Sequence, residues 1–124
     1  MLATDEGRVK FWPETSVEQD GVMEFTFQGE MQPYRFSILE QSPPSRFAFH
    51  YFGNTTATFE LQSDGRGGTD LTLTETGFPN EAHRIENYAG WVTVLMNLKA
   101  AVDYGVDLRN HDPARTWGQG YCET

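Results

Sequence analysis

The stretch NYAGWVTVLMNLKAAVDYG, residues 87–105, is a long apolar segment close to the end of the chain. Apolar side chains recur in it at steps of three and four residues, which is the spacing of one face of an α-helix. That face contains Tyr88, Trp91, Leu95, Leu98 and Val102. Gly105 follows where a helix C-cap is expected. The pattern predicts a helix over 83–104 that packs this face against another apolar surface.

Five segments before this helix alternate apolar and polar residues, as half-buried strands do. They are residues 22–28, 33–41, 46–52, 56–62 and 69–76. Short connections join them, including SPPS at 42–45 and the glycine-rich turn at 63–68. Such a succession predicts an antiparallel meander, solvated on one face. The predicted fold class is α+β: a curved antiparallel β-sheet wrapped around one long C-terminal helix that covers its apolar face.

The other side of the predicted helix carries few charges, which is unusual for a solvated face. It contains Thr93, Met96, Asn97, Ala100 and Tyr104. The tail, residues 106–124, offers Leu108, Trp117 and Tyr121 as covering side chains. We expect this tail or a second subunit to cover part of the face, so a homodimer is one expectation.

Composition places the chain among ordinary globular proteins. Its 124 residues predict one domain over 1–124, and 14% of them are aromatic. The net charge of −9 disfavours binding to nucleic acid or to an anionic membrane. No segment is apolar and long enough to span a membrane, and no signal peptide is expected. The single cysteine, Cys122, fits a reducing cytoplasm.

Four motifs carry a resemblance to a known family: FWP at 11–13, SPPSRFAFHYF, GGTDLTLTETGF and AGWVTVLMNLKAAVDYG. With them the chain resembles the activator of heat-shock-protein-ninety ATPase homologue group, within the START-like (SRPBCC) helix-grip superfamily. The resemblance covers most of residues 11–105. It implies a sheet that grips the C-terminal helix, with an apolar cavity between them. Family domains begin with a strand and a short helix before FWP, and both are expected to be lacking in this N-terminally short form.

Strand parity and the resemblance together nominate side chains that face the space between sheet and helix. These candidate cavity-lining residues are Trp12, Phe25, Phe36, Phe47, Phe49, Tyr51, Phe59, Leu71, Leu73, Glu75, Trp91, Leu95 and Leu98. Two interpretations stay open, a pocket for a hydrophobic ligand and a simply packed core. Tyr51 could orient a ligand. Glu75 shares the parity of the inward leucines, so it could point inward as an acid or base or lie at the rim in water.

No cofactor or metal is expected, because no two histidines have the spacing of a metal pair on one element. Three functions fit the remaining features. The favoured one is a non-catalytic domain that binds a hydrophobic small molecule or lipid. The alternatives implied by the resemblance are an enzyme of the cyclase or hydrolase type, which would use Glu75 with Tyr51, and a module that contacts a chaperone.

Overall fold

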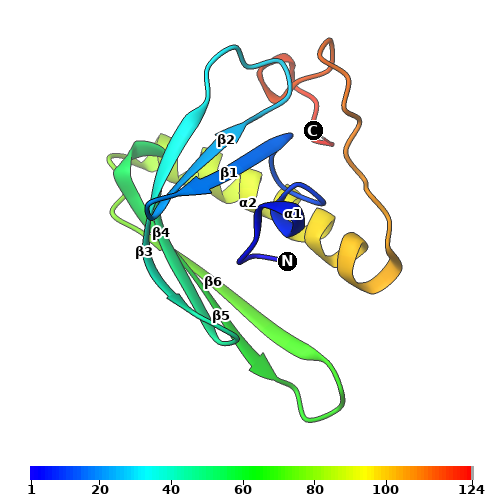
Figure 1. The fold of residues 1–124 in the computed structure, drawn as a ribbon. Helices are drawn as coiled ribbons and strands as arrows, with labels where there is room; N and C mark the ends of the chain where they lie inside the picture. The colour runs from blue at the N-terminus through cyan, green and yellow to red at the C-terminus, as the bar shows by residue number, and fades with distance from the viewer. Residues whose placement is uncertain (124) are drawn as a thin grey trace.

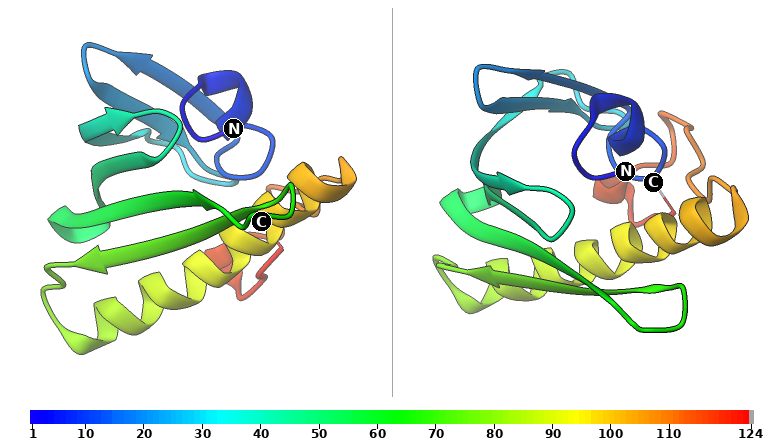
Figure 2. Two further views of the ribbon diagram at one scale, coloured as in Figure 1. Left: turned by 90° about the horizontal axis from the view of Figure 1, so that it is seen from below. Right: turned by 60° about the horizontal axis from the view of Figure 1, so that its bottom comes forward.

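The computed structural model describes residues 1–123 and contains a six-stranded antiparallel sheet in the order β1-β2-β3-β4-β5-β6 (Figure 1). The strands are β1 (Thr15–Gln19), β2 (Val22–Thr26), β3 (Tyr34–Ser42), β4 (Arg46–Tyr51), β5 (Thr55–Ser63) and β6 (Thr69–Thr76). The helical elements are α1 (Asp5–Arg8), the 3-10 turn η1 (Phe52–Asn54), the long helix α2 (Glu81–Tyr104) and the 3-10 turn η2 (Trp117–Gln119). The predicted antiparallel meander followed by a long C-terminal helix is confirmed. The sheet curls so that α2 crosses its concave side (Figure 2).

Both ends of α2 are set by local sequence. The side chain of Asn80 caps the first turn by accepting a hydrogen bond from the backbone N–H of His83, at 2.8 Å. At the other end Gly105 adopts a left-handed conformation with φ of 66°, and its N–H donates to the carbonyl of Ala101. The helix is therefore defined by its caps over Glu81–Tyr104, and Gly105 is the C-cap that the sequence predicted.

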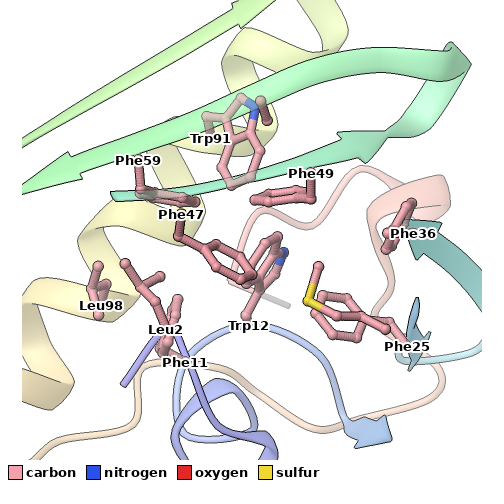
Figure 3. Close-up of a cluster of buried hydrophobic side chains, with 12 residues drawn as sticks. Leu2, Phe11, Trp12, Phe25, Phe36, Phe47, Phe49, Phe59, Trp91 and Leu98 are labelled. Carbon is pink, nitrogen blue, oxygen red and sulfur yellow. The ribbon is translucent and has the colours of Figure 1, made fainter. Parts of the chain in front are cut away.

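The strand register brings the apolar side chains of neighbouring strands together on one face. Phe47 of β4 pairs with Phe59 of β5, which in turn pairs with Leu73 of β6. Side chains directly opposite each other on an antiparallel pair share a face, so the rings form a continuous inner surface. This surface packs against Trp91 and Leu98 of α2 to make the core (Figure 3).

One strand and one α-helix were not predicted from the sequence. Strand β1 pairs with β2 along its whole length but carries a single apolar residue, Val17, which is 55% exposed. An edge strand with no buried face gives no alternation of apolar and polar residues to detect. Before Phe11 no strand forms, as expected, but the expected absence of the short helix is wrong, because α1 makes one turn there.

The predicted buried face of α2 is rotated from its actual position. Tyr88 and Val102 were placed against the sheet, but they are 67% and 58% exposed. Asn97, which was placed on the outer face, is 4% exposed, while Val94 and Ala101 pack against the core. The reason is that the sheet-facing side of the helix includes polar residues, which a reading based on apolar spacing leaves out.

The tail returns along the molecule and is fixed to the segment that precedes β1. Arg109 is buried, and its guanidinium donates to the backbone carbonyls of Pro13, at 2.8 Å, and Val9, at 2.6 Å. The same guanidinium forms a two-point ion pair with Asp107. Burial raises the pKa of Asp107, but the hydrogen bonds from Arg109 outweigh burial and hold this pKa well below its ordinary value. His111 lies 2.7 Å from both Asp107 and Glu14.

Candidate functional site

The centre of the space between sheet and helix is filled by aromatic rings. The ring of Trp12 lies 4.9 Å from that of Phe25, 5.5 Å from Phe49 and 5.4 Å from Trp91, measured between centroids. Figure 3 shows these rings converging on Trp12 from the sheet and from α2. Phe25 and Phe49 are fully buried. The packed-core interpretation therefore describes this central cluster.

Two hydrogen bonds fix the tryptophans of the cluster. The Nε1 of Trp12 donates to the hydroxyl of Tyr51 at 3.2 Å, and the Nε1 of Trp91 donates to Glu75 at 2.9 Å. Burial raises the pKa of Tyr51, so its hydroxyl stays neutral at physiological pH. The rings of Tyr51 and Trp91 stack with centroids 4.7 Å apart. Each indole thus has both a packed environment and a satisfied N–H.

Glu75 connects strands β5 and β6 to α2. Besides Trp91, it accepts hydrogen bonds from the side-chain amide of Asn87, at 2.9 Å, and from the hydroxyl of Thr55. Three donors, two from α2 and one from β5, hold one carboxylate, which indicates a positioning role. The acid–base pair considered for Glu75 and Tyr51 is not assembled by a direct hydrogen bond: each of the two side chains has other partners.

A first cavity, called here the aliphatic cavity, lies between the β5–β6 hairpin and the second half of α2. Its volume is ≈ 620 Å³. The leucine and valine side chains in its wall are Leu2, Leu61, Leu71, Leu95, Leu98 and Val102. Arg46 and Lys99 also line it, and both cations are paired, Arg46 with Glu40 at 2.6 Å and Lys99 with Asp103 at 2.8 Å. The aliphatic cavity is thus apolar, with neutralised ion pairs among its lining side chains.

A second cavity, called here the aromatic cavity, lies beside the first half of α2 and has a volume of ≈ 470 Å³. Its rings come from the segment before β1, from the sheet and its loops, from α2 and from the tail: Trp12, Phe27, Tyr34, Tyr51, Phe52, Trp91 and Trp117. His83 lines it from the first turn of α2, and its Nε2 lies 2.9 Å from the carbonyl oxygen of Phe52. The ring of His83 fits closely over Gly53, whose φ is 74°.

The candidate residues divide into three groups. Phe47, Leu71, Leu95 and Leu98 line the aliphatic cavity, while Trp12, Tyr51 and Trp91 line the aromatic cavity. The other six lie along neither cavity: Phe25, Phe36, Phe49, Phe59, Leu73 and Glu75. Alternation identifies the inner face of a sheet, but it does not show where the rings on that face leave space.

Four rings of the aromatic cavity were not among the candidate residues: Phe27, Tyr34, Phe52 and Trp117. Phe52 was placed at the end of the predicted strand 46–52, where its parity differs from that of Tyr51, but it belongs to η1. Trp117 was expected to cover the helix and belongs to η2. The tail was predicted to cover part of the helix, and Trp117 lines the cavity together with Thr93 of α2. Other apolar side chains of α2, among them Ile85 and Met96, are exposed, so cover by a second subunit stays a prediction.

Within residues 1–123 there is no group of three or more His, Cys, Asp or Glu side chains arranged to hold a metal ion. None of the described helices combines the length and the apolar character needed to cross a membrane.

Solved structures with the same fold come from two bacteria. The crystal structure of the protein SSP2350 from Staphylococcus saprophyticus matches with a TM-score of 0.72 and 23% identity, over 87% of this chain and 82% of that one. The solution structure of BfR322 from Bacteroides fragilis matches with a TM-score of 0.50 and 15% identity, over 82% and 76% of the two chains. At these identities the likeness concerns the fold.

By sequence, none of the curated proteins matches the chain. The family model described as "Activator of Hsp90 ATPase homolog 1-like protein" does match, over residues 2–103. That range runs from the segment before α1 to the last turn of α2, so it includes the whole sheet and the helix that the sheet grips. The chain therefore belongs to the family of activator of Hsp90 ATPase homologue 1-like proteins.

Proposed function

We propose that the protein is a binding module that holds an apolar small molecule or a lipid chain in the aliphatic cavity. The observation that carries this proposal is the cavity itself, ≈ 620 Å³ between sheet and helix with six leucine and valine side chains in its wall. Pockets for small molecules have volumes of about 300–1,000 Å³ and mostly apolar walls. Burial of apolar surface contributes about 25 cal/mol per Å², so binding needs no catalytic group.

The polar side chains along this cavity favour an uncharged ligand or one with an exposed head group. Arg46 and Lys99 each already have a carboxylate partner. A buried anionic head would have to compete with Glu40 or Asp103 for these cations. The ligand class that fits best is an aliphatic chain or a neutral apolar molecule.

Binding inside the cell, in the reducing cytoplasm that the single cysteine suggests, is part of this proposal. The alternative of a cyclase or hydrolase would use Glu75 and Tyr51. Their hydrogen bonds to Trp91 and Trp12 support a structural role for both, so we favour the binding module.

Native mass spectrometry of freshly purified protein tests the proposal. We expect extra mass that extracts into organic solvent, and the same spectrum reports the number of subunits. Binding of the neutral fluorophore N-phenyl-1-naphthylamine to the protein and its variants then shows whether the apolar ligand occupies the aliphatic cavity. Val102 lines the aliphatic cavity and is exposed enough to accept a larger side chain, so Val102→Trp should weaken binding by about tenfold, or about 1.4 kcal/mol.

The matched control is Val92→Trp, the same change on the outer face of α2, away from both cavities. It should leave fluorophore binding unchanged. Equal binding by Val102→Trp and the unmodified protein, with no extractable ligand in the native spectrum, would refute a ligand site in the aliphatic cavity.

A further inference from the structure

The aromatic cavity differs from the aliphatic cavity in the charge of its wall. Three carboxylates line it, from Glu14, Glu30 and Glu86, and no lysine or arginine does. The lining contains one histidine, His83, whose Nε2 is directed at the carbonyl of Phe52. The chain as a whole carries a net charge of −9, which adds to the negative potential at this opening.

We propose that the aromatic cavity binds an organic cation, an ammonium group that carries an apolar or aromatic substituent. This proposal goes beyond the function proposed above, because it concerns a different cavity and a different class of ligand. Either site can exist without the other.

The rings along this cavity form a connected wall rather than isolated side chains. The centroid of Tyr51 lies 4.6 Å from that of Phe52 and 4.7 Å from that of Trp91, and Phe52 lies 4.8 Å from Tyr34. The face of an aromatic ring is negative, so a cation within about 6 Å of a centroid is attracted to it. Several rings side by side favour a cation whose charge is spread over apolar methyl or methylene groups.

One carboxylate at the cavity has no partner within the described residues. Glu14 contacts His111 at 2.7 Å, and burial, together with the charge of Glu30, raises the pKa of Tyr34. The carboxylate of Glu86, which is exposed on α2, takes part in no side-chain hydrogen bond or ion pair across residues 1–123. It is therefore the carboxylate that can approach an ammonium group without giving up another contact.

A buried donor in the wall also points to an occupant. The side-chain Nε2 of Gln28 is buried and has no hydrogen-bond acceptor in the part of the chain that the structure describes. A buried amide without a partner is unfavourable, and such groups mark places where a ligand or water supplies the missing acceptor. An acceptor on the ligand, close to its ammonium group, would satisfy Gln28.

The tail completes this cavity through close packing against the sheet. A side-chain carbon at Gly29 would come within 2.4 Å of Cγ2 of Thr116, so the loop after β2 and the start of η2 touch without space between them. Trp117 follows directly and contributes its ring to the wall. The wall that holds the proposed cation is thus built from the sheet, the helix and the tail.

Isothermal titration calorimetry with benzyltrimethylammonium tests the proposal on the full chain, with phenylacetate as a probe of similar size and opposite charge. We expect the cation to bind and phenylacetate to bind at least about tenfold more weakly, because carboxylates line the opening. Added salt should reduce the difference, because it screens exposed charges. Equal affinity for the two probes would overturn the proposal, and so would failure of the cation to bind.

Two variants locate the bound cation. Glu86→Gln should weaken cation binding by about threefold, as expected for the loss of an exposed charge contact, and Trp117→Ala by about fivefold through the loss of one ring. The matched control is Glu6→Gln, the same change at an exposed position of α1 away from both cavities. If Glu86→Gln and Glu6→Gln weaken cation binding equally, the effect comes from the overall charge of the protein, and the assignment to this cavity is overturned. Circular dichroism of each variant checks that the fold is intact.

Discussion

Replacing Trp91 by alanine should lower the free energy of unfolding by about 3–5 kcal/mol, the range for removal of a large buried aromatic side chain. The side chain is 6% exposed, and its ring packs against Trp12 from the N-terminal segment and against Tyr51 and Phe59 from the sheet. Its Nε1 donates to Glu75. The alanine variant would lose these ring contacts and leave the carboxylate with one donor fewer.

Trp91→Phe separates the contribution of the hydrogen bond to Glu75 from that of ring packing. Phenylalanine keeps a ring in the cluster but has no N–H for Glu75. A hydrogen bond to a charged group contributes about 1.5–3 kcal/mol, so the free energy of unfolding of this variant should fall by up to that amount. The hydrogen bonds from Asn87 and Thr55 to Glu75 remain and reduce the loss. The further loss from phenylalanine to alanine measures the packing of the ring.

Urea unfolding followed by far-ultraviolet circular dichroism measures these differences, provided that the slope of stability against urea is unchanged. Tyr88→Ala is the control on the same helix, because Tyr88 is 67% exposed and should cost no more than about 0.5 kcal/mol. A decrease in the free energy of unfolding below about 1 kcal/mol for Trp91→Ala would refute the reasoning, because removal of a buried ring of this size destabilises a protein by more than that.

Two further predictions concern backbone conformation and pH. Gly53→Ala should destabilise the fold by more than the roughly 1–2 kcal/mol that a left-handed backbone costs alanine. The reason is that its Cβ would lie 2.6 Å from the ring of His83. Gly65→Ala, at a position with a φ of 76° and open space around it, should cost only the roughly 1–2 kcal/mol of the left-handed backbone. Denaturant unfolding compares the pair, and equal losses would contradict the contact with His83. A hydrogen bond with Asp107 raises the pKa of His111, so protonated His111 stabilises the fold below the ordinary histidine pKa, and this gain is lost as the pH rises through the raised value. Since the ring is partly exposed, the gain should be under about 1 kcal/mol, and the thermal stability of His111→Gln should lack this pH dependence. A variant with the same pH dependence as the unmodified protein would contradict the assignment.

The sheet could be predicted from sequence wherever one face of a strand is buried. The segment 69–76 was predicted with its bounds, because Leu71 and Leu73 alternate with threonines that face water. Strand β1 was not predicted, because both its faces are largely solvated and Val17 is its one apolar side chain. Alternation of apolar and polar residues indicates that one face of a strand is buried. An edge strand can pair through backbone hydrogen bonds without burying either face, so it need not show this alternation.

The candidate site was harder to predict than the fold. Leu95 and Leu98 were assigned correctly to the helix face that meets the sheet, but Asn87 and Asn97 also lie there and Tyr88 does not. Asn87 is partly buried because it donates to Glu75, a residue from a distant strand. Such a pairing depends on tertiary structure and leaves no periodic signal in either segment.

The position of Trp12 at the centre of the ring cluster has a consequence for synthesis on the ribosome. Trp12 and the inner face of the sheet emerge early, yet the helix that covers them begins only at Glu81. At about 5–20 residues per second, translation leaves this aromatic surface uncovered for seconds. Until Trp91 has left the ribosome, the nascent chain presents its most apolar face to the surroundings, and it is then most prone to aggregate.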